Sequence, residues 1–146
     1  MNFKMNIKKL NESAIVPTYG SAAAAGADLY ACTDSDIVIA PGATVLVHTG
    51  VAMAIPDGYV GLVFARSGLA TKRGLAPANK VGVIDSDYRG EIMVALHNHS
   101  AATQTVAHGE RIAQIVFMPY AAADFDVVDE LDSTDRGAGG FGSTGK

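Results

Sequence analysis

The chain has 146 residues, of which 49% are hydrophobic and 18% charged, and its formal net charge is −4 at pH 7. This length predicts one domain, and the apolar content is ample for a packed core. The acidic balance and the lack of a basic run argue against a nucleic-acid partner. A small phosphorylated ligand stays compatible, because a few well-placed arginines suffice to bind it.

Three features of the sequence indicate in which compartment of the cell the protein is expected. Cys32 is the only cysteine, so no disulfide can form within the chain and a reducing cytoplasm is expected. The N-terminal lysines lack the apolar stretch that is typical of a signal peptide. The longest apolar stretch, residues 112–123, is interrupted by Gln114 and is too short to span a membrane. We therefore expect a cytoplasmic protein without a membrane partner.

Short β-rich segments follow one another along the chain, with turn residues between them. Gly50 is expected to separate the second segment from the third. This spacing favours an antiparallel barrel or sandwich over alternating βαβ units. The predicted strands are residues 36–40, 44–48, 51–55, 59–65, 81–85, 91–98, 104–107, 111–118 and 126–131.

Two local elements are predicted in more detail. Residues 81–85 and 91–98 are expected to pair as a β-hairpin across the five-residue loop 86–90. The one predicted helix covers residues 68–72, with Ser67 as its N-cap.

The loop of this predicted hairpin resembles the start of a calcium-binding loop, with Asp85, Asp87 and Gly90 in place. Arg89 occupies the fifth position and Leu96 the twelfth, where the loop needs a bidentate carboxylate, so an EF-hand is excluded. Asp85 is then either a solvated turn carboxylate or a group at the edge of the core that holds a water molecule.

His97 and His99 would share one face of a strand, but no third ligand accompanies them. Ordinary hairpin histidines are therefore favoured over a metal site. Cys32 has no partner pattern for a nucleophile and is expected to be a small buried residue.

Polar residues also stand where a predicted strand meets the helix. Arg66, Ser67 and Gly68 could form a phosphate site from a guanidinium, a hydroxyl and backbone amides. A helix cap beside a surface arginine is the equally weighted alternative. Arg111 and Gln114 are three residues apart in an apolar strand. We expect them on opposite faces, one in a buried ion pair and the other at a ligand.

The C-terminal stretch RGAGGFGSTGK, residues 136–146, contains two overlapping phosphate-loop spacings, GxGxxG and GxxxxGK. Neither spacing can act as a phosphate-binding motif here, because no predicted strand precedes the glycines and no predicted helix follows them. Two interpretations remain from the residues alone. One is a solvated Gly-rich tail. The other is a flap that contacts a nucleotide through Arg136, Phe141, Ser143 and Thr144.

Five segments, in this order, resemble the motifs of the trimeric deoxyuridine triphosphate nucleotidohydrolases (dUTPases). They are AGADLYA (25–31), ARSGLA (65–70), GVIDSDYRGEIMVALHN (82–98), GERIAQIVFMP (109–119) and RGAGGFGSTG (136–145). The resemblance runs from about residue 10 to the end. It implies an all-β fold, a distorted β-barrel or jelly roll with one short helix. It also implies a β-barrel domain over residues 1–131 and a flexible Gly-rich flap over residues 132–146, which closes a neighbouring subunit's active site.

This resemblance implies an enzyme that cleaves dUTP to dUMP and pyrophosphate by attack of water on the α-phosphorus. Such an enzyme limits uracil in DNA and supplies dUMP for dTMP synthesis. The resemblance also implies a homotrimer with shared active sites, and Mg²⁺ bridging the phosphates. Asp85 would orient and deprotonate the attacking water, and Asp28 would touch a metal-bound water.

The same resemblance assigns the nucleoside contacts. Asn79 and main-chain groups around Val83, Ile84 and Met93 would read the uracil edge. Tyr88 would pack on the deoxyribose and crowd out a 2′-hydroxyl.

The phosphate contacts would come from other subunits. One subunit would contribute Arg66, Ser67, Gly68 and Gln114. The tail of a third would place Phe141 on the uracil, and near the phosphates it would place Arg136, Ser143 and Thr144.

Two alternatives differ in reaction or in class. dCTP deaminases share the scaffold but carry a catalytic glutamate on the second strand of the equivalent hairpin. Residues 94–98 of this chain, VALHN, include no carboxylate, and Glu91 lies too close to the turn to replace the catalytic glutamate. A non-catalytic nucleotide-sensing module would need neither a water-activating Asp85 nor a closing flap.

Overall fold

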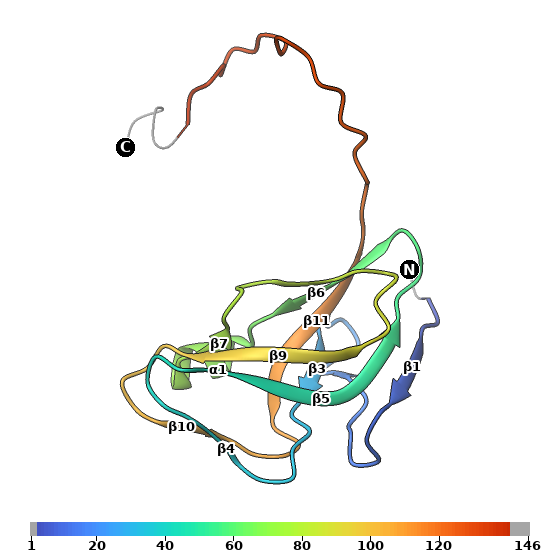
Figure 1. Ribbon diagram of the computed structural model, residues 1–146. Coiled ribbons are helices and arrows are strands. Elements are labelled where there is room, and N and C mark those ends of the chain that lie inside the picture. Colours follow the sequence, from blue (N-terminus) through green and yellow to red (C-terminus); the bar gives the residue numbers. More distant parts are fainter. Residues whose placement is uncertain (1–2, 141–146) are drawn as a thin grey trace.

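The computed structural model describes residues 3–140, and most of its regular structure is antiparallel β-sheet (Figure 1). The one helix, α1, spans Ser67–Arg73. The strands are β1 (Asn6–Lys9), β2 (Thr18–Tyr19), β3 (Ala27–Tyr30), β4 (Ile37–Ile39), β5 (Thr44–Ala54), β6 (Tyr59–Phe64), β7 (Leu75–Pro77), β8 (Gly82–Ile84), β9 (Glu91–Asn98), β10 (Gln104–Val106) and β11 (Arg111–Pro119).

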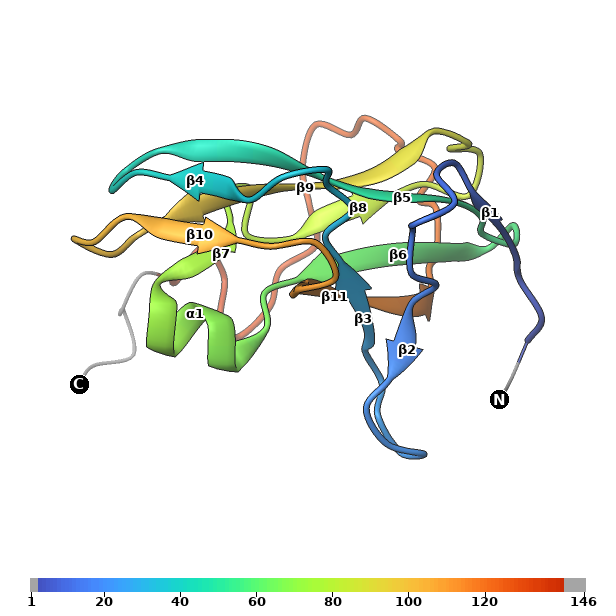
Figure 2. The same ribbon diagram turned by 90° about the horizontal axis from the view of Figure 1, so that it is seen from below.

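These strands form two large sheets and one small one. The first large sheet has the order β1–β5–β9–β7, and the second has the order β2–β3–β11–β6–β8. The two lie face to face as layers, and the β10–β4 pair continues the layers at one end (Figure 2). Within residues 3–140 no strand pairing joins the large sheets, so the predicted all-β fold is confirmed as an open jelly-roll sandwich.

The core lies between the layers because side chains alternate along each strand. In β9 every second residue is buried, including Ile92, Val94 and Leu96. Leu29 and Ile115 of the opposite sheet are fully buried and join the same cluster. Each such side chain stabilises the fold by about 1.5–3 kcal/mol relative to an exposed one.

Strand β5 is continuous, so the expectation that Gly50 would end a strand is wrong. The pairing of β5 with β9 shifts register between His48 and Ala52, which marks a β-bulge. Gly50 lies in this bulge with φ +68°, and a Cβ there would come within 2.7 Å of the Cβ of Ala14. The glycine therefore bends the strand without interrupting it.

The predicted β-hairpin of residues 81–85 and 91–98 is also wrong. β8 pairs with β6, whereas β9 pairs with β5 and β7, so the two strands belong to different sheets. The loop 86–90 crosses from one layer to the other. Pairing with long-range partners, β6 for β8 and β5 for β9, outweighed the short loop that favours local pairing.

Three further expectations need correction. Arg66, and not Ser67, occupies the N-cap of α1, with extended backbone and no side-chain cap bond. Residues 126–131 form no strand, and every residue from 121 to 138 is exposed. The short strands β1, β2, β3 and β7 were not predicted. The predicted end of the helix is confirmed: Gly74 adopts the left-handed conformation with φ 67° and donates to the carbonyl of Ala70.

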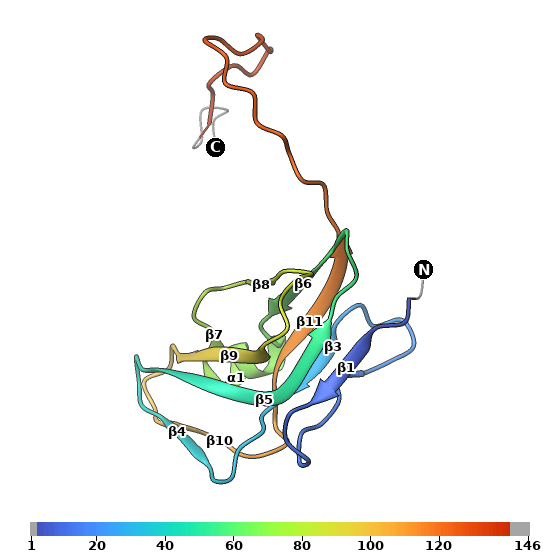
Figure 3. The same cartoon turned by 45° about the vertical axis from the view of Figure 1, so that its right-hand side comes forward.

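A long arm follows β11 and leaves the body (Figures 1 and 3). Tyr120 still donates its N–H to the carbonyl of Gly58, at 3.1 Å. From residue 121 to 140, the hydrogen bonds are all local ones between positions 134 and 139. The arm therefore has no hydrogen-bonded anchor on its own body in the part of the chain that the structure describes.

Candidate active site

A cleft opens between β8 and β9, because these consecutive strands belong to different sheets and diverge. It has two adjoining cavities of about 210 and 250 Å³. Four residues line both cavities: Leu46, Val83, Ile84 and Met93. Leu46 was not among the predicted site residues. From the sequence alone, a leucine in a β-rich segment that lines a cavity cannot be distinguished from one that packs in the core.

The two cavities differ in the residues that line only one of them. Asn79 and Gly82 line the first cavity, together with residues of β6, β7 and β9. Asp85, Tyr88 and Glu91 line the second. Asn79, Val83, Ile84 and Met93 thus lie together, as the sequence predicted, and Asp85 and Tyr88 lie next to them.

Asp85 follows β8 directly and is exposed at the rim of the second cavity. Its backbone carbonyl accepts the N–H of Tyr88 at 3.2 Å, which closes the turn. Within residues 3–140, its carboxylate accepts no hydrogen bond from protein. Both carboxylate oxygens are therefore available to a water molecule.

The ring of Tyr88 is held against the wall of the second cavity. Its hydroxyl donates to the carbonyl of Glu91 at 2.9 Å. The ring lies over Gly90, where an added Cβ would come within 2.6 Å of Cζ of Tyr88. The absence of a side chain at position 90 therefore lets the ring adopt this position.

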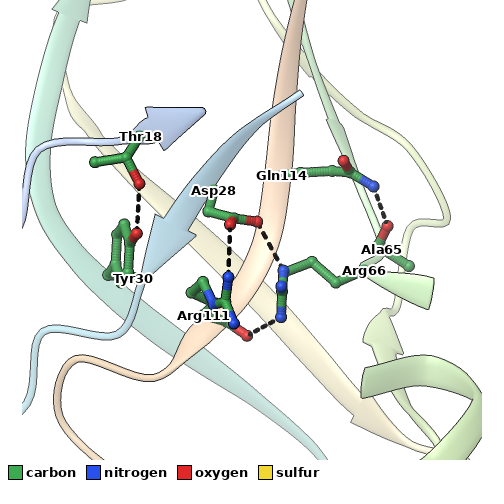
Figure 4. A network of polar contacts seen from close by, with 7 residues as sticks. All are labelled: Thr18, Asp28, Tyr30, Ala65, Arg66, Arg111 and Gln114. Atoms are coloured by element: carbon green, nitrogen blue, oxygen red, sulfur yellow. Dashed lines mark hydrogen bonds and ion pairs between the residues drawn. The ribbon is translucent and has the colours of Figure 1, made fainter. Parts of the chain in front are cut away.

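A second polar cluster lies on the β2–β3–β11–β6–β8 sheet, at strands β3 and β11 (Figure 4). Asp28 is 8% exposed, and its two carboxylate oxygens contact two arginines. Arg66 Nε donates to Oδ1 at 2.7 Å, and Arg111 Nη1 donates to Oδ2 at 3.3 Å. Arg66 Nη1 also donates to the carbonyl of Arg111 at 3.5 Å. The ion pair satisfies a carboxylate that burial would otherwise penalise.

Arg111 and Gln114 lie on the same face of β11, so the prediction of opposite faces is wrong. The pairing of β11 with β3 shifts register between Arg111 and Ala113. As a result, Arg111 stands opposite Tyr30 and Gln114 opposite Asp28, two residues that share a face of β3. The bulge thus gathers Asp28, Arg111 and Gln114 on one surface (Figure 4).

The other residues predicted near phosphates lie beside this cluster. The side-chain amide of Gln114 donates to the carbonyl of Ala65 at 2.9 Å and lies against Gly26. Ser67 and Gly68 are exposed in the first turn of α1, and an added Cβ on Gly68 would meet nothing within 4 Å. The backbone at the helix start is therefore open to a ligand.

Asp85 and Arg66 lie far apart within one chain. β8 pairs antiparallel with β6, with Ile84 opposite Gly61, so Asp85 lies near Val60. Arg66 follows the opposite end of β6, six residues further on. At about 3.3 Å per residue, this separates the two positions by about 20 Å. One chain does not bring them to the same phosphate group.

The C-terminal glycine-rich stretch is only partly described. Arg136 Nε donates to the carbonyl of Gly139 at 2.8 Å, and Gly137 N–H donates to the carbonyl of Thr134 at 3.0 Å. Arg136 is thus part of a local turn. The predicted contacts through Phe141, Ser143 and Thr144 lie outside the described residues.

The remaining candidates carry no site. The rings of His97 and His99 contact each other, with centroids 4.4 Å apart. Partial loss of solvation, and then the charges of His97 and Lys80, lower the pKa of His99 below its ordinary 6.5. Cys32 is half-buried, so its predicted full burial is wrong. In residues 3–140, no three His, Cys, Asp or Glu side chains are grouped to hold a metal.

No helix in the described part of the chain is long and apolar enough to cross a membrane.

Comparison with known proteins matches residues 12–145 to the dUTPase family. Deoxyuridine 5′-triphosphate nucleotidohydrolase of Syntrophotalea carbinolica is 48% identical over 141 residues, which covers 97% of this chain and 96% of the relative. The protein of the same name from Desulfitobacterium hafniense is 54% identical over 131 residues, covering 89% and 87%.

Solved structures show the same architecture. The dUTPase of Staphylococcus bacteriophage 80alpha, solved with dUpNHpp, superposes with a TM-score of 0.91 at 28% identity. The alignment covers 99% of this chain and all of the phage chain. The dUTPase of phage phi11 of S. aureus superposes with a TM-score of 0.82 at 25% identity, covering 90% of this chain and all of the other.

Proposed function

Since this chain belongs to the dUTPase family, we propose that it hydrolyses dUTP to dUMP and pyrophosphate in the cleft between β8 and β9. The observation that carries the proposal is the content of that cleft. Asp85, whose carboxylate has no protein partner within residues 3–140, stands beside an aromatic ring, Tyr88, and next to a mostly apolar cavity. The cavity and the ring suit a deoxynucleoside, and the carboxylate suits an attacking water.

The uracil would occupy the cavity lined by Asn79 and Gly82. Main-chain groups around Val83, Ile84 and Met93 would read its edge. An apolar pocket rejects an extra methyl by only about 1–3 kcal/mol, but backbone pressed against that carbon produces a clash with thymine. The amino group of cytosine would face a donor and leave buried polar groups unpaired, at about 1–3 kcal/mol each.

The deoxyribose would pack on Tyr88, whose fixed ring would leave no space for a 2′-hydroxyl. Asp85 would orient a water molecule toward the α-phosphorus and accept its proton. The new bond forms between the water oxygen and phosphorus, the bond from phosphorus to the bridging oxygen breaks, and pyrophosphate leaves. A general base of this kind contributes about 10²–10⁴-fold to the rate.

The phosphates would be bound by Arg66, Ser67, Gly68 and Gln114 of a second subunit in a homotrimer. The separation of about 20 Å between Asp85 and Arg66 within one chain supports this division. A chain on its own would hold only half of the residues that the reaction needs.

The C-terminal arm that follows β11 would complete the site from a third subunit, with residues 132–146 as the flap. Exposed apolar side chains on the arm support this proposal. Phe125 is 90% exposed, Val127 95% and Leu131 87%, so they lack an apolar surface on their own body. Arg136, Phe141, Ser143 and Thr144 would then reach the nucleotide.

Mg²⁺ would be held mainly by the substrate's phosphate oxygens and by water. The residues fit this arrangement, because Mg²⁺ keeps several waters and does not require a cluster of protein carboxylates. Asp28, Arg66 and Arg111 form a cluster on the proposed phosphate side of the site, called here the phosphate-side cluster. Asp28 is its carboxylate, and both its oxygens already bind arginines. It would therefore contact the ion only through water. The ion would neutralise charge on the phosphates.

In a cytoplasmic setting this reaction would limit uracil in DNA and supply dUMP for dTMP synthesis. A direct test incubates the protein with dUTP or dCTP and Mg²⁺ and measures pyrophosphate and ammonia. Pyrophosphate from dUTP is the expected product. Ammonia from dCTP would assign the chain to the deaminases instead, and no product from either would favour a binding module.

A further inference from the structure

Glu91 connects the bulge of β5 to the loop 86–90, which carries Tyr88 and directly follows Asp85. We propose that Glu91 is a positioning residue for sugar selection: its carboxylate fixes the start of β9, and its carbonyl holds the hydroxyl of Tyr88. This inference rests on the proposed function, because it assumes that Tyr88 contacts the sugar of dUTP.

The carboxylate of Glu91 binds β5 at two places. Oε1 accepts the backbone N–H of Gly50 at 2.7 Å, and Oε2 lies 2.8 Å from Nδ1 of His48. These two residues belong to the stretch where the pairing of β5 with β9 shifts register. The glutamate side chain is 20% exposed. It therefore replaces the regular strand pairing that the bulge removes.

The bulge is a rigid anchor. Gly50 is buried, and besides Ala14 an added Cβ would come within 2.9 Å of Sγ of Cys32. Its carbonyl accepts the N–H of Leu10 at 2.7 Å, while the carbonyl of His48 accepts the N–H of Cys32 at 2.8 Å. Because the bulge is fixed on both sides, it fixes the carboxylate that binds it.

The loop has few other attachments. Within the described chain, the hydrogen bonds of residues 86–90 all stay between positions 85 and 91. One of them joins Tyr88 Oη to the carbonyl of Glu91, the first residue of β9. Glu91 thus follows the loop directly, and its carboxylate joins the start of β9 to β5, beside the backbone pairing of Glu91 with Ala52 and the hydrogen bond from Thr49 Oγ1 to the carbonyl of Ile92.

The expected consequence of this attachment is a fixed position for the ring of Tyr88. A ribose differs from a deoxyribose by a single oxygen, so a small movement of Tyr88 would make room for it. Misplacement by about 1 Å can change rates by about 10²-fold. If Glu91 loses its carboxylate, the start of β9 loosens, the carbonyl moves, and Tyr88 follows. Selection against UTP then weakens more than turnover of dUTP.

The test compares Glu91→Ala with Glu91→Gln and measures kcat/KM for dUTP and for UTP. The amide of Gln can still accept from Gly50 and can donate to neutral His48. We expect Glu91→Ala to lower the dUTP/UTP ratio by about tenfold or more, and Glu91→Gln to keep it within about threefold of the unsubstituted protein. An unchanged ratio in Glu91→Ala, or an equal loss in both variants, would overturn the proposal.

His97→Ala is the matched control, because Thr44 Oγ1 and His97 Nδ1 form a 2.8 Å hydrogen bond at the other end of the same β5–β9 pairing. It should lower thermal stability to a similar extent and leave the dUTP/UTP ratio unchanged. A protein that never hydrolyses dUTP would contradict the proposed function, whereas normal dUTP turnover with an unchanged Glu91→Ala ratio would contradict only the role of Glu91.

Tyr88→Phe tests the same link without touching the glutamate, and so remains informative if Glu91→Ala does not fold. It removes only the hydroxyl that donates to the carbonyl of Glu91. The dUTP/UTP ratio should fall by about tenfold. A ratio equal to that of the unsubstituted protein would show that this hydrogen bond does not position the ring.

Discussion

The cleft between β8 and β9, proposed to bind the nucleoside, and the phosphate-side cluster of Asp28, Arg66 and Arg111, proposed to lie at the phosphates, are built by different means. The cleft results from backbone geometry: β8 and β9 follow each other in sequence but pair in different sheets. The gap between them is lined mainly by apolar residues, with Asn79, Asp85, Tyr88 and Glu91 as the polar ones. The cluster consists of charged side chains: Arg66 and Arg111 both bind the carboxylate of Asp28.

This difference suggests what each region can do before the substrate arrives. A cleft made by strands keeps its shape, so it can reject a base that differs by a methyl group. A cluster of paired charges must exchange some of its contacts when a phosphate binds. We therefore expect substitutions in the cleft to change kcat and selectivity, and substitutions in the cluster to act on binding.

The largest effect is expected for Asp85→Asn, which removes the proposed base from the cleft. The value of kcat should fall by about 10²–10⁴-fold while affinity for a slowly hydrolysed dUTP analogue stays nearly the same. Asp87→Asn is the control, because Asp87 lies in the same loop but lines neither cavity. An equal loss of rate and affinity would assign Asp85 to binding.

Removal of residues 136–146 should produce the next largest effect. The arm buries little of its own chain, so fold and assembly state should persist. Turnover should fall by about 10²-fold, because closing groups act most strongly in the transition state. Size-exclusion chromatography and steady-state kinetics on the truncated protein measure both. Turnover at the full-length rate would show that the stretch is only a solvated tail.

The two arginines of the phosphate-side cluster should differ. Arg66 has the shorter contact to Asp28 and is 24% exposed, whereas Arg111 is 51% exposed. Arg66→Ala should lower kcat/KM by about 10–100-fold through a lost phosphate contact. Arg111→Ala should cost less than about fivefold, because exposed ion pairs contribute little. The reverse order would mean that Arg111 is the phosphate ligand.

The smallest effect concerns the pair His97 and His99, which lies outside both regions. His99 should titrate below its ordinary pKa of 6.5, in an NMR titration of its ring protons. Because its folded-state pKa is lowered, protonation disfavours the folded state. This contribution is absent above pH 6.5 and grows as the pH falls below it. His97→Ala should move the midpoint of His99 upward, and no movement would contradict an influence of His97.

Much of the fold could be predicted because it depends on local patterns. Alternating apolar residues in 91–98 predicted β9, and Gly74 predicted the end of α1. The choice of partner strands could not be predicted in this way. The loop 86–90 favours a local β-hairpin, but β8 pairs with β6 and β9 pairs with β5. Long-range packing decided the topology.

The candidate site shows the same division. Residues inside one motif, such as Val83, Ile84 and Asp85, could be placed together from the sequence. The bulge in β11 could not, and it reversed the expected relation of Arg111 and Gln114. A one-residue shift in strand register moves every side chain beyond it to the other face of the sheet. No single residue in GERIAQIVFMP predicts such a shift.

The most direct test of the proposed reaction follows oxygen from the solvent. The protein hydrolyses dUTP in ¹⁸O-water with Mg²⁺, and mass spectrometry locates the label in the products. Attack at the α-phosphorus by a water that Asp85 orients predicts one ¹⁸O in the phosphate of dUMP and none in pyrophosphate. Label in pyrophosphate, with none in dUMP, would mean attack at the β-phosphorus and would contradict the account.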